Sequence, residues 1–169
     1  SGRFDFFCGG IAIPSRNIES ERLLRKGSNG IQFFTTQVLY DSENIKKMLT
    51  YYNNICEKNK VIPRRILLSF APVSSNKNID FLKWLGVEIP LETEKRLSNQ
   101  GLKMTDESLK IATEILIDIL QYNEEEQIRV PVGLNVEHIM SYNFQYSINM
   151  LQELSKIYRK FCIKTSLYD

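Results

Sequence analysis

Four strand-then-helix units follow one another along the 169-residue chain, and this order constrains the fold more than any other feature. The apolar runs at residues 4–13, 31–39, 65–70 and 128–136 have the composition of buried strands. Strands that alternate with helices indicate a parallel sheet with right-handed crossovers. We therefore predict a single α/β domain over residues 1–169, either a small open sheet or part of a (β/α)8 barrel.

The segments between these strands carry apolar residues at helical spacing. Helices are expected at residues 19–26, from a cap at Asp41 or Ser42 through Ile55, around 79–85 with a stop at Gly86, at 91–97, around 109–119 and around 148–161. The third connection is the longest, and it reads as an insertion that holds two extra helices. No linker divides the chain.

Composition excludes several classes of function. The net charge is +2, and basic residues are mixed with acidic ones, so we expect no nucleic-acid partner. No apolar run approaches the roughly 20 residues that a membrane-spanning helix needs. Three scattered cysteines and one histidine, His138, match no metal-ligand spacing and fit a reducing, cytoplasmic setting. The start, Ser1-Gly2-Arg3, is typical of a processed or artificial end and suggests missing upstream sequence.

Polar residues recur where the predicted strands end. In parallel α/β folds the carboxyl ends of the strands share one rim, which is where sites form. The residues expected there are Ser15, Arg16, Gln37, Ser69, Ser74, Asn135 and Glu137. Their recurrence on one rim predicts a binding site for a small molecule.

Gln37 is the most informative of these residues. Alternation along the second strand places Ile31, Phe33, Thr35, Gln37 and Leu39 on one face. An unpaired buried amide costs roughly 1–3 kcal/mol, so an amide inside an apolar strand needs a partner. Either neighbouring strands satisfy it, or it pairs with the edge of a bound heterocycle.

The remaining candidates each have an ordinary structural interpretation. Gly9-Gly10 indicates close backbone approach or a bulge, or else a flat ligand lying against the strand. Glu19 and Lys26 are by default a first-turn acid and a last-turn base of one helix. Glu137 and His138 could form an acid–base couple or be structural.

The order of several motifs resembles that of the methylenetetrahydrofolate reductase family. The motifs are Ala12-Ile13-Pro14, then Leu23-Leu24-Arg25-Lys26 before Gly30, then Thr36-Gln37-Val38-Leu39-Tyr40-Asp41, then 65–72 with Asn78, and 81–90. The resemblance implies a (β/α)8 barrel of which this chain is the later half, about strands five to eight. It also implies a flavoprotein of one-carbon metabolism, in which FAD carries hydride from NAD(P)H to methylenetetrahydrofolate.

The resemblance also implies roles for single residues. Gln37 matches a glutamine that contacts the folate, with Asn135 and Glu137 as further substrate-binding candidates on the last strand. Lys26 matches a lysine near the flavin's phosphate arm, and Glu19 matches an acid near the cofactor. Ile11 and Ile13 fall on the strand that lies along the flavin. No catalytic residue is implied within this chain.

Departures from the family pattern define the alternatives. The first strand ends in Ile13-Pro14-Ser15-Arg16 and lacks the family's tyrosine and histidine. The family's catalytic glutamate and Arg-Gly-Asp-type flavin loop belong to earlier strands that are absent here. We therefore expect a piece of a longer flavoprotein that is inactive alone and associates through its open sheet edges, for instance as a homo-oligomer. The alternative is a non-catalytic domain that binds a small molecule or a protein.

Overall fold

The computed structural model describes residues 6–99 and 103–165. Its elements in chain order are β1 (Gly9–Ala12), α1 (Glu19–Ser28), β2 (Phe33–Val38), α2 (Glu43–Lys58), β3 (Arg65–Phe70), α3 (Asn76–Trp84), α4 (Leu91–Ser98), α5 (Met104–Glu125), β4 (Val132–Val136), the 3-10 helix η2 (Ser141–Asn143) and α6 (Phe144–Thr165). The predicted alternation of strands and helices is confirmed. The two helices predicted within the insertion, at 91–97 and around 109–119, are α4 and α5.

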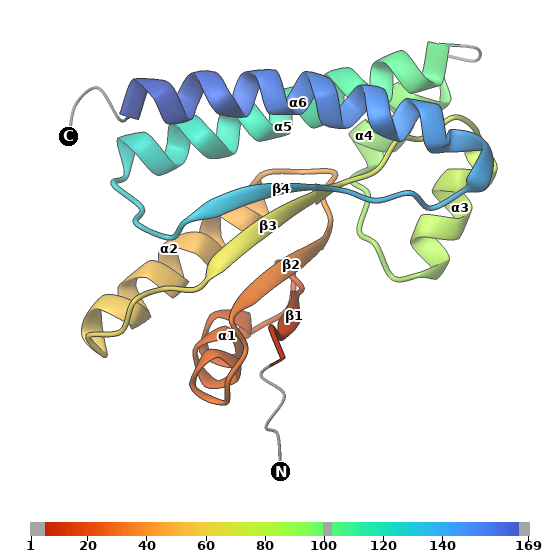
Figure 1. Cartoon of the computed structure of the whole chain (residues 1–169). Helices are drawn as coiled ribbons and strands as arrows, with labels where there is room; N and C mark the ends of the chain where they lie inside the picture. The colour runs from red at the N-terminus through yellow and green to blue at the C-terminus, as the bar shows by residue number, and fades with distance from the viewer. Residues whose placement is uncertain (1–5, 100–102, 166–169) are drawn as a thin grey trace.

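The strands form one parallel sheet in the order β1-β2-β3-β4 within the described residues. Each connection returns the chain to the next strand along, so right-handed crossovers place the helices on the same face. Helices α1, α2, α5 and α6 accordingly contact one another in that order around the outside of the sheet (Figure 1). This arrangement is consistent with part of a (β/α)8 barrel.

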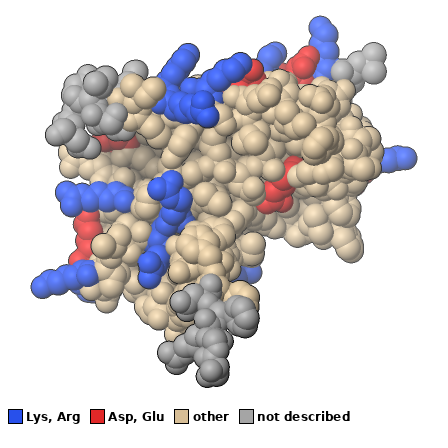
Figure 2. Space-filling model, viewed as in Figure 1, with Lys and Arg blue, Asp and Glu red and all other residues tan. Residues whose placement is uncertain are grey.

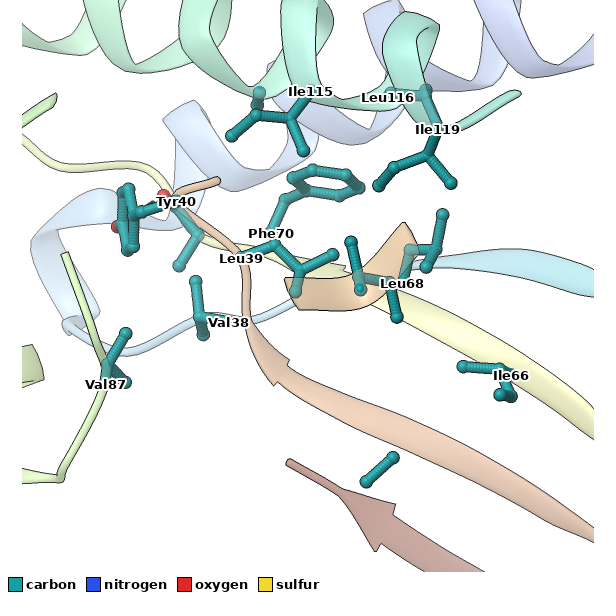
Figure 3. Close-up of a cluster of buried hydrophobic side chains, with 14 of the residues drawn as sticks. Val38, Leu39, Tyr40, Ile66, Leu68, Phe70, Val87, Ile115, Leu116 and Ile119 are labelled. Carbon is teal, nitrogen blue, oxygen red and sulfur yellow. Dashed lines mark hydrogen bonds between the residues drawn. The ribbon is translucent and has the colours of Figure 1, made fainter. Parts of the chain in front are cut away.

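The hydrophobic core lies between the sheet and these helices. Phe34, Ile66 and Leu68, which point toward the helices, are 0% exposed. Figure 3 shows Phe70 of β3 directed at a cluster of isoleucine and leucine side chains on α5. The helix-covered side of the sheet, here called the outer face, therefore provides most of the apolar burial.

The rim at the carboxyl ends of β3 and β4 is fixed by a buried amide network. Asn143 of η2 donates to the carbonyl of Pro72 over 3.3 Å and to Asn78 Oδ1 over 3.2 Å. Ser74 Oγ donates to Asn143 Oδ1 over 2.7 Å. Because Asn78 belongs to α3, the network joins the helix after β3 to the segment after β4.

Charge is distributed unevenly over the face shown in Figure 2. Lys and Arg side chains lie at the left of the view, toward the amino ends of β3 and β4, and along the top, over α6, while the centre is largely uncharged. On this face the carboxyl rim is therefore not a basic patch.

Candidate functional site

The side of the sheet opposite the helices, here called the inner face, is where the predicted site residues gather. The strand register aligns Ile11, Thr35, Leu67 and Gly133 across it. Ile11 is 58% exposed, whereas Ala12, its neighbour on the outer face, is fully buried. The inner face is thus open on the β1 side, and apolar side chains are available there for contact.

Two glycines on the inner face are explained by neighbouring side chains. A Cβ on Gly9 would overlap the ring of Phe33, and a Cβ on Gly133 would lie 2.7 Å from Leu67 Cδ2. The Phe33 ring also stacks on Phe7, with centroids 5.3 Å apart. The Gly9-Gly10 pair is therefore explained neither by close backbone approach nor by a bulge: at Gly9 the group against the strand is the chain's own phenyl ring.

A bulge in β2 determines where Gln37 lies. Thr35 pairs with Leu67 but Val38 pairs with Ser69, so β2 carries one extra residue here. The Ser69 N–H donates to Thr36 Oγ1 over 2.9 Å instead of to a carbonyl. Beyond the bulge the alternation changes, and Leu39 turns into the outer core at 7% exposure. The prediction that Leu39 shares a face with Gln37 is wrong for this reason.

Gln37 is half-buried at the carboxyl end of β2. A cavity of about 20 Å³ adjoins it, lined in part by Pro14, Ser15 and Glu88, and this is room for about one water molecule. Its Nε2 lies 4.0 Å from where a Cβ on Gly86 would be. Among the hydrogen bonds of residues 6–99 and 103–165 none involves the Gln37 side chain, and its amide is not one of the enclosed polar atoms that lack a partner, so it is open to water. Neighbouring strands therefore do not satisfy this amide.

Asn135 and Glu137 lie across β3 from Gln37. Asn135 Nδ2 donates to Ser69 Oγ over 3.0 Å and to Glu137 Oε1 over 3.5 Å. Burial raises the pKa of the Glu137 carboxyl, and a hydrogen bond with Ser69 partly offsets that shift. The pKa of Tyr40 is raised by its burial and, to a smaller extent, by the charge of Glu137. The result is a small polar cluster that holds a carboxyl able to take up a proton.

The predicted couple of Glu137 and His138 does not form in the described residues. The His138 ring packs edge-on against Phe144, with centroids 5.1 Å apart, and no hydrogen bond joins it to Glu137. The imidazole of His138 is exposed to solvent, whereas the carboxyl of Glu137 is half-buried, so the two side chains lie in different surroundings.

Glu19 and Lys26 lie together at the end of β1. The Glu19 side chain is 1% exposed, and its Oε1 lies 3.5 Å from Lys26 Nζ. Its Oε2 lies 3.6 Å from Arg16 and 3.9 Å from Arg22 and is without a hydrogen bond. A buried carboxylate requires such compensation, because its desolvation costs several kcal/mol. Lys26 Nζ also donates to the carbonyl of Ile11 over 2.7 Å.

The structure therefore brings the predicted residues together as two groups. Gln37 of β2, Asn135 of β4 and Glu137 just after β4 lie at the carboxyl rim. The other group consists of Ile11 of β1, Ile13 just after β1, and Glu19 and Lys26 of α1, and Glu19 Oε1 accepts the Ile13 N–H over 3.2 Å. The hydrogen bond of Thr36 at the bulge could not be predicted, because a bulge has no signature in a run of apolar and polar residues.

Sequence reasoning also missed a cavity of about 1,020 Å³ between the start of α2 and helices α4 and α5. Its charged walls are largely paired. Arg96 binds Glu107 and Glu114, and Asp118 accepts hydrogen bonds from Ser42 and Lys46. Those two bonds lower the pKa of Asp118, with the Ser42 hydroxyl as the larger cause. The cavity is formed by the insertion. Its helices were predicted from the sequence, but how they pack and the cavity that they leave were not.

Among residues 6–99 and 103–165, none of the helices combines the length and the hydrophobicity that a membrane span requires. No group of three or more His, Cys, Asp or Glu side chains in that part of the chain could hold a metal ion.

Comparison with known proteins places this geometry in context. A solved structure of an uncharacterized protein from Clostridium thermocellum, described as binding two copies of 5-methyl-5,6,7,8-tetrahydrofolic acid, superposes with a TM-score of 0.75. The two are 26% identical, and the match covers 88% of this chain and 53% of the other. This chain thus spans about half the length of that protein.

No curated protein sequence matches the chain. The family model for methylenetetrahydrofolate reductase matches residues 9–154, which include every strand of the sheet and every predicted site residue. The chain therefore belongs to the methylenetetrahydrofolate reductase family.

Proposed function

We propose that this chain binds a reduced folate at the carboxyl rim of its inner face, as one part of a longer folate-binding protein of its family. The observation that carries the proposal is the unpartnered amide of Gln37 at that rim. Family membership and the tetrahydrofolate described for the similar structure support it. We also propose that this piece is the later half of the barrel, and the match to about half of a similar structure is compatible with its length.

The chemistry of the ligand suits these side chains. The pteridine ring of a folate presents N–H donors beside ring-nitrogen and carbonyl acceptors on one edge. An amide offers a donor and an acceptor side by side, and a carboxylate offers two acceptors. Gln37 would pair with one part of the edge, and the cluster of Asn135 and Glu137 would accept from another.

A flavin fits the residues assigned to it only in part. Ile11 offers an exposed side chain, and Arg16, Arg22 and Lys26 are cations that would suit a diphosphate. Glu19, however, is enclosed, and the Lys26 nitrogen is already held by Glu19 and by Ile11. Bound FAD would supply hydride chemistry, but these two side chains do not fit it as they stand.

The second candidate is the complete reductase activity, with FAD reduced by NAD(P)H and methylenetetrahydrofolate as acceptor. The exposed side chain of Ile11 on β1, with half-buried Ile13 just after the strand, favours it. After incubation with FAD and gel filtration, a yellow protein that NAD(P)H bleaches would support this activity. A colourless protein that still binds folate would leave a non-catalytic binding domain.

Titration calorimetry with 5-methyltetrahydrofolate tests the folate site. Gln37→Met keeps the length of the side chain and removes its amide, and Gln152→Met makes the same change at an exposed position on α6. We expect Gln37→Met to weaken binding about tenfold or more, the effect of one lost hydrogen bond to a buried polar edge. Equal affinities of both variants, or no saturable binding by the unsubstituted chain, would contradict the proposal.

A further inference from the structure

The small cavity beside Gln37 shares its walls with two larger cavities at the carboxyl end of β2. Asp41 and Glu88 line both this cavity and the one between α2, α4 and α5. Ser15 and Asn44 line both this cavity and a further one, of about 320 Å³, between the start of α1 and the first turns of α2. We call the latter the α1–α2 cavity. A ligand held by Gln37 therefore has two directions in which the rest of the molecule can continue.

The cavity between α2, α4 and α5 does not suit an anion. Five carboxylates line it, and the cations among its described lining residues are Lys83 and Arg96. Both cations are already held by acids. Lys83 Nζ lies 3.0 Å from Glu94, and Arg96 binds Glu107 and Glu114. An anionic group that entered this cavity would therefore meet like charge.

The α1–α2 cavity has the opposite balance of charge. Its acids are Glu19 and Glu21. The Glu19 side chain is 1% exposed, and its carboxylate is paired with three cations, Arg16, Arg22 and Lys26. Glu19 is thus more than neutralised, and positive charge is in excess around this cavity.

Two cations of the α1–α2 cavity can take a further anionic partner. Lys47 is exposed on α2, and within the described residues its ammonium makes no hydrogen bond or ion pair. The Arg16 side chain is 39% exposed and lies 3.6 Å from Glu19. A guanidinium has five N–H donors, so this single contact leaves most of them free for a second carboxylate.

Apolar side chains line the same cavity beside these cations. Ile18 is 68% exposed and Tyr51 is 67% exposed. Ile18 has a φ of 55°, in the left-handed region that a β-branched residue rarely adopts. Strained residues of this kind are frequent where a protein contacts a ligand. Together the two side chains offer an aromatic and an aliphatic surface to a flat apolar group.

We propose that the α1–α2 cavity binds the tail of the folate, in which a p-aminobenzoyl ring carries a glutamate. The ring contacts Ile18 and Tyr51, and the carboxylates pair with Lys47 and Arg16. A volume of about 320 Å³ is within the usual range for small-molecule pockets. The inference rests on the folate binding proposed above, and it adds the direction in which the molecule leaves the rim.

Calorimetric titration with two ligands tests the tail site. The ligands are 5-methyltetrahydrofolate and its tetrahydropterin head without the tail. We expect the complete folate to bind at least tenfold more tightly than the head. Equal affinities for the two would overturn this inference and leave the folate site at Gln37 intact. Failure of both ligands to bind would overturn the proposed function, and this inference with it.

Lys47→Met assigns the tail to the α1–α2 cavity. It keeps the side chain's stem and removes its charge, and Lys58→Met makes the same change in the exposed last turn of the same helix. We expect Lys47→Met to weaken binding of the complete folate about fivefold and to leave binding of the head unchanged. Gln37→Met should weaken both. Arg16→Gln is a second variant with the same expected effect as Lys47→Met. If both variants bind the complete folate as tightly as Lys58→Met does, the proposal is wrong.

ADP distinguishes a carboxylate tail from a nucleotide diphosphate, which the same cations would attract. We expect p-aminobenzoylglutamate to compete with 5-methyltetrahydrofolate, and ADP at the same concentration to have no effect. Competition by ADP that Lys47→Met abolishes, with none by p-aminobenzoylglutamate, would assign the cavity to a nucleotide and overturn the proposal.

Discussion

The two faces of the sheet are made from alternate residues of the same strands, yet they differ in what they do. On the outer face Phe34, Ile66 and Leu68 are fully enclosed by helices. On the inner face, half-buried Gln37 and Asn135 lie at the carboxyl rim, and Ile11 is exposed. Apolar burial on the outer face thus provides most of the stability of the fold. The inner face can therefore carry polar side chains, such as the amide of Gln37, whose burial would otherwise be costly.

Leu67 and Leu68 give the sharpest test of this difference, because they are adjacent in β3 and point to opposite faces. We expect Leu68→Ala to lower the free energy of unfolding by about 3 kcal/mol, since it removes a fully buried side chain and leaves a cavity. Leu67 is only half-buried, so we expect Leu67→Ala to cost about 1 kcal/mol. Chemical denaturation measures both values, and equal losses would contradict the division between the faces.

Thr35 and Thr36 extend the comparison to polar groups. Thr36 Oγ1 accepts the Ser69 N–H at the bulge, in a buried position. Thr36→Val keeps the shape and leaves that N–H unpaired, so we expect a loss of about 1–3 kcal/mol. Thr35→Val, on the inner face, should change stability by less than about 0.5 kcal/mol. A small loss from Thr36→Val, measured by the same denaturation, would mean that the bulge is not held by this contact.

The outer face was the part of the molecule that the sequence could predict. The strand at residues 65–70 has its predicted bounds, because a continuous apolar run between polar residues leaves little choice of register. Helix periodicity likewise located α2 and α5, because tertiary packing requires the apolar stripe that the sequence displays. These predictions succeed because buried positions require apolar residues, and apolar residues can be recognised in the sequence.

The inner face was predicted less well, for a different physical reason. Gln37 could be assigned to the end of β2 from its place in the strand, but one extra residue in the bulge reversed Leu39. Glu19 and Lys26 read as ordinary helix-end charges, and nothing in their spacing shows that both reach the edge of β1. Contacts of this kind depend on register and on backbone direction, which a single sequence does not encode locally.

The smallest predicted effect concerns the pH dependence of stability at Glu137. Burial raises the pKa of its carboxyl above the usual 4.5. The folded protein then holds the proton to a higher pH than the unfolded chain does, so unfolding releases a proton in that interval and stability falls as pH rises. The stabilising contribution is complete below pH 4.5 and is lost as pH passes through the raised value.

Glu137→Gln cannot ionise and should remove this slope. We expect the substituted protein to gain stability relative to the unsubstituted chain as pH increases from 4 toward 8. Glu124→Gln, which makes the same change at an exposed carboxyl near the end of α5, is the matched control. Denaturation midpoints over a pH series measure the difference. If the difference in midpoint between Glu137→Gln and the unsubstituted chain stays constant with pH, the Glu137 carboxyl is exposed to water and is not part of the polar cluster on the inner face. Glu137 would then not belong to the site that Gln37 and Asn135 define.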